Sequence, residues 1–128
     1  MVPQICNLGM SGFTFCGADV GGFGADCTPE LLSRWVEAAC FSPLFRNHSC
    51  QGSKRQEPWQ FGDEVVAINR KYIELRYKFL PYIYDLFYKG LETGLPVMRP
   101  LVLHYANDPE VRNLNGEFLV GANFTVCS

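Results

Sequence analysis

Apolar residues recur every three or four positions in three segments of the chain, which predicts three helices. The first covers residues 2–10. The second starts with a Thr-Pro-Glu sequence at residues 28–30, where a capping threonine precedes a proline whose φ already suits a helix. The third is long, roughly residues 62–89, and we expect Pro81 to kink or divide it.

Short apolar runs bounded by glycine or proline predict buried strands at residues 12–16 and 96–103, and residues 117–127 begin one or two more. A strand, a glycine-rich loop, helices and a second strand make a βαβ order, so we expect residues 12–16 and 96–101 to be adjacent and parallel. The long loop at residues 41–61 interrupts the periodicity, and loops of this length are often functional.

Composition narrows the class of protein. The chain has 128 residues, of which 48% are hydrophobic and 19% charged, which is too apolar for intrinsic disorder. It has no apolar run of the ~18–20 residues that cross a bilayer, so we expect no membrane partner. The net charge is −2 and no block of basic residues stands out, so we expect no nucleic-acid partner.

Six cysteines leave three possibilities open: free and mostly buried thiols, one or more disulfides, or a metal site. Free thiols are favoured, because the chain is rich in core-forming residues and has no CxxC pair. The first ten residues lack the basic region and apolar core of a signal peptide. The compartment stays open, with the cytoplasm slightly favoured.

The glycine-rich segment 17–24 carries one carboxylate, Asp19, just beyond the first predicted strand. In α/β folds ligands bind at the carboxyl ends of parallel strands, so Asp19 could accept hydrogen bonds from hydroxyl groups. The alternative is that it bonds to amides of its own turn. A phosphate site fits badly, since the spacing is neither GxGxxG nor GxxxxGK and the aspartate would repel the anion.

Two further clusters lie in the long loop. Residues 45–49, Phe-Arg-Asn-His-Ser, place guanidinium, amide, imidazole and hydroxyl groups together, which suits a polyhydroxylated ligand or a carboxylate network. His48 taken alone is more often structural. Residues 54–59 are Lys-Arg-Gln-Glu-Pro-Trp, and for Lys54 and Gln56 we favour a solvated loop with Trp59 packed as a lid.

Five motifs in order carry a resemblance: Gly-Ala-Asp-Val-Gly-Gly-Phe, Arg-Asn-His-Ser, Lys-Arg-Gln-Glu-Pro-Trp, Leu-Arg-Tyr-Lys-Phe-Leu-Pro-Tyr-Ile-Tyr and Pro-Val-Met-Arg-Pro-Leu. Together they resemble glycoside hydrolase family 31, which holds α-glucosidases, α-xylosidases and sucrase-isomaltase-like enzymes. The resemblance covers about residues 1–121, and the last eight residues depart from the family pattern.

The resemblance implies an α/β fold that is part of a (β/α)₈ TIM barrel. Residues 1–116 would be the C-terminal part of the catalytic barrel, with residues 12–16 as its seventh strand and 96–101 as its eighth. Residues 117–128 would begin the following β-sandwich domain. A complete barrel takes about 250 residues, so we expect the rest of the barrel to lie elsewhere in the same polypeptide.

The family is retaining, so one carboxylate attacks the anomeric carbon and a second protonates the leaving oxygen. Neither of the family's catalytic aspartate motifs is present here, and the resemblance therefore assigns this chain no catalytic residue. It does assign substrate binding to Asp19 and His48, a positioning role for pocket carboxylates to Arg46, and an aromatic wall to Phe23. No metal or organic cofactor is implied, since two carboxylates and water suffice.

We therefore expect a segment of a retaining α-glycosidase that acts on terminal α-glucosidic or related bonds of α-linked oligosaccharides and is inactive by itself. Glucoside, xyloside and galactoside specificity stay open. A carbohydrate-binding module without catalysis is the main alternative, and a nucleotide-binding βαβ domain is the third.

Overall fold

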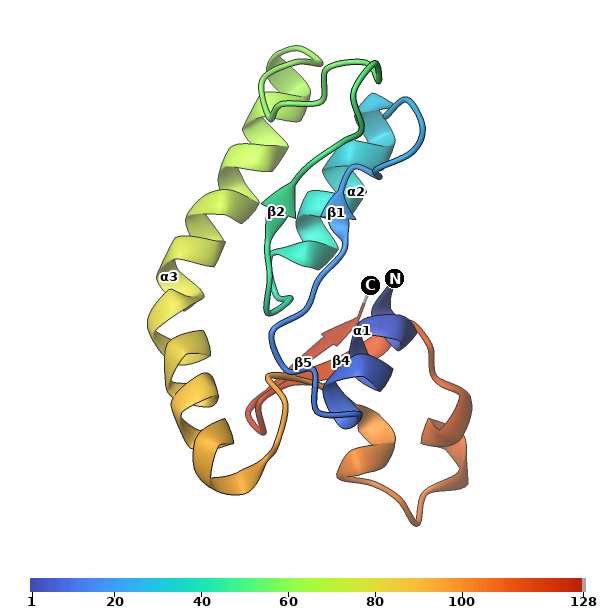
Figure 1. Ribbon diagram of the computed structural model, residues 1–128, viewed down its shortest axis with the longest axis vertical. Coiled ribbons are helices and arrows are strands. Elements are labelled where there is room, and N and C mark those ends of the chain that lie inside the picture. Colours follow the sequence, from blue (N-terminus) through green and yellow to red (C-terminus); the bar gives the residue numbers. More distant parts are fainter. Residues whose placement is uncertain (128) are drawn as a thin grey trace. The chain divides into compact units, whose positions relative to one another are not determined.

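A computed structural model of the protein describes residues 1–127 (Figure 1). They form two compact units. The middle unit is Gly17–Leu80, and the terminal unit combines Met1–Cys16 with the residues from Pro81 onward. Within residues 1–127, no helix is both long enough and apolar enough to cross a membrane.

The middle unit is built from helix α2 (Pro29–Ala39), the first part of helix α3 (Asp63–Thr93) and two short strands. Helix α2 begins where the sequence predicts, because Oγ1 of Thr28 accepts a hydrogen bond from the Leu31 amide at 3.2 Å. Strands β1 (Asp19–Val20) and β2 (Arg46–Asn47) run parallel beside this helix (Figure 1).

The core of the middle unit is formed by side chains of β1, α2 and α3. Partly buried aromatic rings, among them Trp35, Phe45 and Phe61, pack around fully buried aliphatic side chains. Burial of this apolar area is the main force that holds α2, α3 and the strands together. The buried members of the cluster are Val20, Cys27, Leu32, Val36, Ala39 and Val65.

A buried arginine fixes the chain between α2 and β2. The Arg76 guanidinium on α3 donates to the carbonyls of Cys40 at 3.0 Å, Ser42 at 2.5 Å and Pro43 at 2.9 Å. These carbonyls follow the C-terminal end of α2, where the helix dipole also favours a positive charge. Burial lowers the pKa of Arg76 from its ordinary value. The three bonds set the path by which the chain enters β2.

Helix α3 confirms the predicted long helix but not its end. Its first turn is closed by the Val66 amide bonding the Gly62 carbonyl at 3.0 Å. The helix continues through Pro81 to Thr93, so the proline does not divide it, and Gly90 does not stop it. Gly94 with φ +71° follows, a conformation that glycine adopts without strain.

The terminal unit holds helix α1 (Val2–Met10), which the sequence predicts, and an antiparallel sheet of order β3-β4-β5. These strands are Met98–Pro100, Glu117–Val120 and Phe124–Cys127. Helix α1 contacts β3 and β4. The predicted strands at 117–127 are thus confirmed. The predicted strand at 96–103 is confirmed over three residues, after which the chain forms the 3-10 helix η1 (Leu101–Leu103). A second one, η2 (Pro109–Asn113), precedes β4.

The prediction of a buried strand at residues 12–16 is wrong. This segment is not in a strand, and the side chains of Phe13 and Phe15 are each 66% exposed. A strand needs a neighbour for its backbone groups, and pairing begins later, at Asp19. The expected parallel pairing of residues 12–16 with 96–101 is wrong as well, because β1 pairs with β2 and β3 pairs with β4.

Within residues 1–127 all six cysteines are free, as the sequence favours. Cys6, Cys27 and Cys40 are buried. Burial raises the pKa of Cys6 to about 11 and that of Cys40 to about 12. A buried thiol of this kind stays protonated at neutral pH and behaves as a small apolar side chain.

We expect Arg76→Met to lower the free energy of unfolding by about 3 kcal/mol, because it leaves buried carbonyls without donors. Chemical denaturation measures the loss. Arg70→Met removes an exposed arginine from the same helix and should change the free energy by less than about 0.5 kcal/mol. Equal effects of the two substitutions would show that the guanidinium bonds contribute nothing specific.

A second expectation concerns Tyr72, whose hydroxyl donates a short hydrogen bond to Oε1 of Glu37. This bond and, to a lesser extent, burial raise the pKa of Tyr72 to about 12. The neutral phenol is the favoured form, so its bond persists through pH 10 and is lost as the pH approaches 12. In Glu37→Gln we therefore expect one more tyrosine to ionise between pH 9 and 11 than in the unsubstituted protein, measured by ultraviolet absorbance. Glu30→Gln, which removes an exposed partner of Arg34, should leave the count unchanged.

Candidate functional site

The parallel strand pair brings two of the predicted site residues together. Asp19 of β1 lies opposite Arg46 of β2 in the register. Oδ1 of Asp19 accepts two hydrogen bonds from Arg46, from Nε at 3.1 Å and from Nη2 at 2.5 Å. The aspartate side chain is 20% exposed and the arginine side chain 54%. The ion pair thus fixes the carboxylate while leaving Oδ2 outside the pair.

The other two predicted residues, Phe23 and His48, form a second pair in the same unit. Their ring centroids lie 5.5 Å apart with the planes tilted by 33°. Phe23 follows β1 by three residues, and His48 directly follows β2. All four predicted residues therefore lie on or just after the two strands. The middle unit presents a carboxylate, a guanidinium, an imidazole and an aromatic ring there.

The turn after β1 explains its glycines. The Gly22 amide donates to the backbone carbonyl of Asp19 at 2.9 Å, so the turn does not use the Asp19 side chain. The carboxylate bonds to Arg46, and the alternative that it bonds to the amides of its own turn is wrong. Gly21 and Gly22 have φ of +90° and +92°, which side chains with a Cβ rarely adopt. A Cβ on Gly21 would also lie 2.9 Å from Nε2 of Gln56.

The long loop is anchored to the glycine-rich segment by further bonds. The Cys50 amide donates to the Phe23 carbonyl at 3.0 Å. The Lys54 amide donates to Oδ1 of Asp26 at 2.9 Å, and its ammonium group lies 3.5 Å from Oδ2. Lys54 is exposed, as the sequence predicts, whereas Trp59 is 66% exposed and is not packed as a lid.

Sequence reasoning missed Gln56. It was expected in a solvated loop, yet its side chain is 3% exposed and its Nε2 lies within hydrogen-bonding distance of several oxygens of the site. The prediction is wrong because the ends of β1 and β2 leave carbonyls that need a donor. Position 56 stands between charged residues in the sequence, and no periodic pattern marks it as buried.

This arrangement suits recognition of hydroxyl groups better than proton transfer. A carboxylate held by guanidinium is a strong acceptor, and an imidazole beside an aromatic face can bond a hydroxyl while the ring packs on a sugar. Within residues 1–127, no three side chains of the His, Cys, Asp and Glu types are grouped so that they could hold a metal ion.

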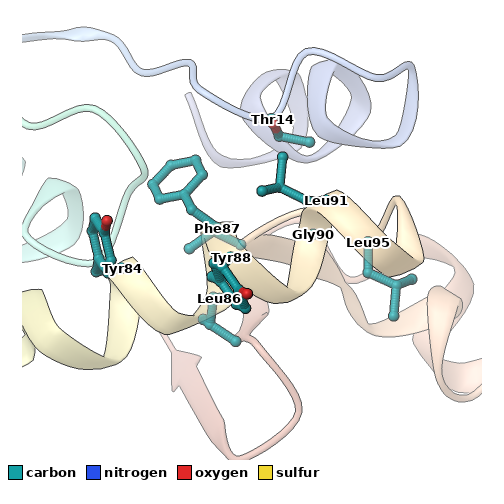
Figure 2. A pocket seen from close by; sticks show the side chains of 9 residues that line it. Thr14, Tyr84, Leu86, Phe87, Tyr88, Gly90, Leu91 and Leu95 are labelled. Carbon is teal, nitrogen blue, oxygen red and sulfur yellow. The ribbon is translucent and has the colours of Figure 1, made fainter.

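The described cavities lie elsewhere. A cavity of about 560 Å³ in the middle unit is lined by α2 and α3, with Glu37 and Tyr72 among its walls. Another of about 270 Å³ in the terminal unit is largely apolar, and Figure 2 shows Leu91 of α3 directed towards Thr14. Its polar side chains are those of Thr14, Tyr84 and Tyr88, and no charged side chain lines it. The expectation that Asp19 and His48 face one cavity stays a prediction.

Known proteins resemble this chain along almost its whole length. It is 52% identical over 125 residues to alpha-glucosidase 2 of Bacillus thermoamyloliquefaciens, which covers 98% of this chain and 16% of that protein. It is 43% identical over 125 residues to neutral alpha-glucosidase C of Mus musculus, covering 98% of this chain and 14% of that protein. The chain thus spans about a sixth or less of these relatives.

A solved structure agrees with these relatives. The GH31 dextranase of Flavobacterium johnsoniae, complexed with glucose, matches with a TM-score of 0.93 and 41% identity over 98% of this chain and 16% of that one. The family model described as the glycosyl hydrolases family 31 TIM-barrel domain matches residues 1–86. The α/β fold is accordingly that of a TIM-barrel region, and the chain belongs to glycosyl hydrolase family 31.

Proposed function

We propose that this chain is a segment of the catalytic barrel of a retaining α-glycosidase and supplies part of the pocket for the sugar that is released. The observation that carries the proposal is the Asp19–Arg46 ion pair on adjacent parallel strands, together with the Phe23–His48 ring contact just after those strands. The carboxyl ends of parallel strands are where TIM barrels build their active sites.

The strand pairing suggests how the chain would be placed in such a barrel. The adjacent parallel strands β1 and β2 would be neighbouring strands of the barrel, and the antiparallel sheet β3-β4-β5 would begin the β-sandwich domain that follows. The match of the barrel model to residues 1–86 supports the first part of this division. The remaining barrel strands and both catalytic aspartates are then supplied by the rest of the polypeptide.

The four side chains would assist a reaction whose bond-making groups lie outside this chain. A retaining glycosidase places its two carboxylates about 5–5.5 Å apart across the scissile bond. Asp19 is engaged by a guanidinium, so it suits an acceptor for sugar hydroxyls and not a nucleophile or proton donor. His48 would bond a further hydroxyl, and Phe23 would cover an apolar face of the ring. Such contacts accelerate the reaction where they strengthen as the sugar distorts towards the transition state.

The proposed substrate is an α-linked oligosaccharide. Alpha-glucosidase 2 and neutral alpha-glucosidase C are named for α-glucosides, and the dextranase structure contains glucose. The polar groups described here bind hydroxyls that glucose shares with related sugars. Linkage and sugar preference would depend on parts of the pocket supplied by other segments.

A chimera tests whether this chain is an exchangeable barrel segment. The matching residues of the Bacillus alpha-glucosidase 2 are replaced by this chain, and hydrolysis of p-nitrophenyl α-glucoside is measured. We expect a folded enzyme with kcat/KM within about tenfold of the host, because a segment at 52% identity preserves the barrel interfaces.

A folded but inactive chimera would contradict the proposal, and so would one that cannot fold. The isolated chain provides the control for the alternative function. If the 128-residue chain by itself unfolds cooperatively and binds maltose in a calorimeter, it is a carbohydrate-binding module and the segment proposal fails.

Substitutions in the chimera test the residues. We expect Asp19→Asn to lower kcat/KM about a hundredfold, since a charged acceptor bond contributes about 1.5–3 kcal/mol, and His48→Ala about tenfold. Glu30→Gln, on the exposed face of α2, is the matched control and should leave the kinetics unchanged. Unaltered kinetics in both Asp19→Asn and His48→Ala would remove these residues from the pocket.

A further inference from the structure

Gln56 joins the two halves of the candidate site through one amide group. Its Nε2 lies 2.9 Å from the Val20 carbonyl and 3.2 Å from the Gly22 carbonyl, both in or after β1. The same atom lies 3.2 Å from Oδ1 of Asn47 and 3.5 Å from the His48 carbonyl, both in or after β2. One nitrogen therefore serves oxygens from both strands of the parallel pair.

The bonding pattern fixes which end of the amide faces the strands. The backbone carbonyl of Gln56 accepts a bond from Nδ2 of Asn47 at 2.7 Å. Nδ2 must therefore be the donor end of Asn47, and Oδ1 is the end that faces Gln56. The other three neighbours are backbone carbonyls, which accept and cannot donate. Nε2 is therefore the end of the Gln56 amide that faces these oxygens, and its two N–H donors are shared among them.

This buried amide compensates for the shortness of the strands. A pair of two residues on each side makes few ladder bonds, and its ends would leave carbonyls without donors. Each of the four oxygens is within two positions of a candidate site residue: Val20 beside Asp19, Gly22 beside Phe23, and Asn47 and His48 beside Arg46. A shift of the amide would therefore be transmitted to both pairs of the site.

We propose that Gln56 is the positioning residue of this sugar pocket, which holds the Asp19 turn against the His48 segment at the spacing that the substrate requires. The proposal rests on the proposed function of the four side chains. Gln56 touches no reacting atom in this scheme and acts through the backbone of the residues that do.

The protein environment at position 56 allows few substitutes. Asparagine is one methylene too short to reach both strands. Glutamate has the length but offers oxygens to oxygens when it is ionised, and donates one bond when it is protonated. Methionine has nearly the shape of glutamine and no donor. Gln56→Met and Gln56→Glu thus separate the donor function from the space that the side chain fills.

Kinetics in the chimera test the positioning role. We expect Gln56→Met to raise KM about tenfold with a smaller change in kcat, since loss of the amide loosens sugar contacts that substrate binding uses. For Gln56→Glu we expect kcat/KM relative to the unsubstituted chimera to recover as the pH is lowered from 7 to 5, because protonation restores one donor. A loss of stability alone would lower the active fraction at constant KM.

A double-mutant cycle links Gln56 to the site. If Gln56 acts through His48, then Gln56→Met should cost much less in a His48→Ala background than in the unsubstituted one. Additive effects would overturn the proposal. Asn69→Leu is the matched control: it removes another buried amide of the middle unit, whose Nδ2 bonds the Pro58 carbonyl at 3.0 Å. It should reduce stability and leave KM unchanged.

Hydrogen exchange on the chimera tests the contact independently of enzymatic activity. The Gly22 and Cys50 amides, which bond the carbonyls of Asp19 and Phe23, should exchange at least about tenfold faster in Gln56→Met. The Cys40 amide at the end of α2 should be unaffected. Unchanged or absent protection at Gly22 and Cys50 would overturn the inference. An inactive chimera, by contrast, would contradict the proposed function alone.

Discussion

A parallel pair of two residues on each side is the constraint on which the rest of the middle unit depends. Such a pair has too few ladder bonds to hold two loops in place, and the carbonyls at its ends need hydrogen-bond donors from elsewhere in the chain. The chain solves this with side chains from later in the sequence. Arg76 binds the carbonyls that lead into β2, and Gln56 binds those at the carboxyl ends of both strands. The geometry of the Asp19–Arg46 pair follows from these two anchors.

The two anchors differ in charge for a physical reason. Arg76 serves a helix end, where partial negative charge accumulates and a cation is favoured. Gln56 lies between backbone carbonyls, and its neighbours Arg55 and Glu57 already pair with each other at the surface, so a buried charge at position 56 would need a partner of its own. A neutral amide satisfies the oxygens without that cost. Because Gln56 is neutral, it does not compete with Arg46 for the carboxylate of Asp19.

The sequence predicted the helices well and the strands less well. Thr28 and the apolar repeat identified α2, and the apolar run at residues 117–127 identified β4 and β5, because these signals are local. The buried strand predicted at residues 12–16 is absent, because aromatic residues indicate a buried strand only where a neighbouring strand can pair with it. The four site residues could be named from motifs, and the structure brings them together as two pairs. Gln56 could not be predicted as a site residue, because its burial depends on which backbone carbonyls the fold leaves without a donor.

The distribution of thiols has a practical consequence for labelling. Cys127 is exposed at the end of β5, while Cys6, Cys27 and Cys40 are buried. Cys6 and Cys40 should react slowly with alkylating reagents for two reasons: their raised pKa values leave little thiolate, and burial blocks access of the reagent. A maleimide dye at neutral pH should therefore mark Cys127 first. A fluorophore placed there would report on the terminal sheet without a single engineered cysteine.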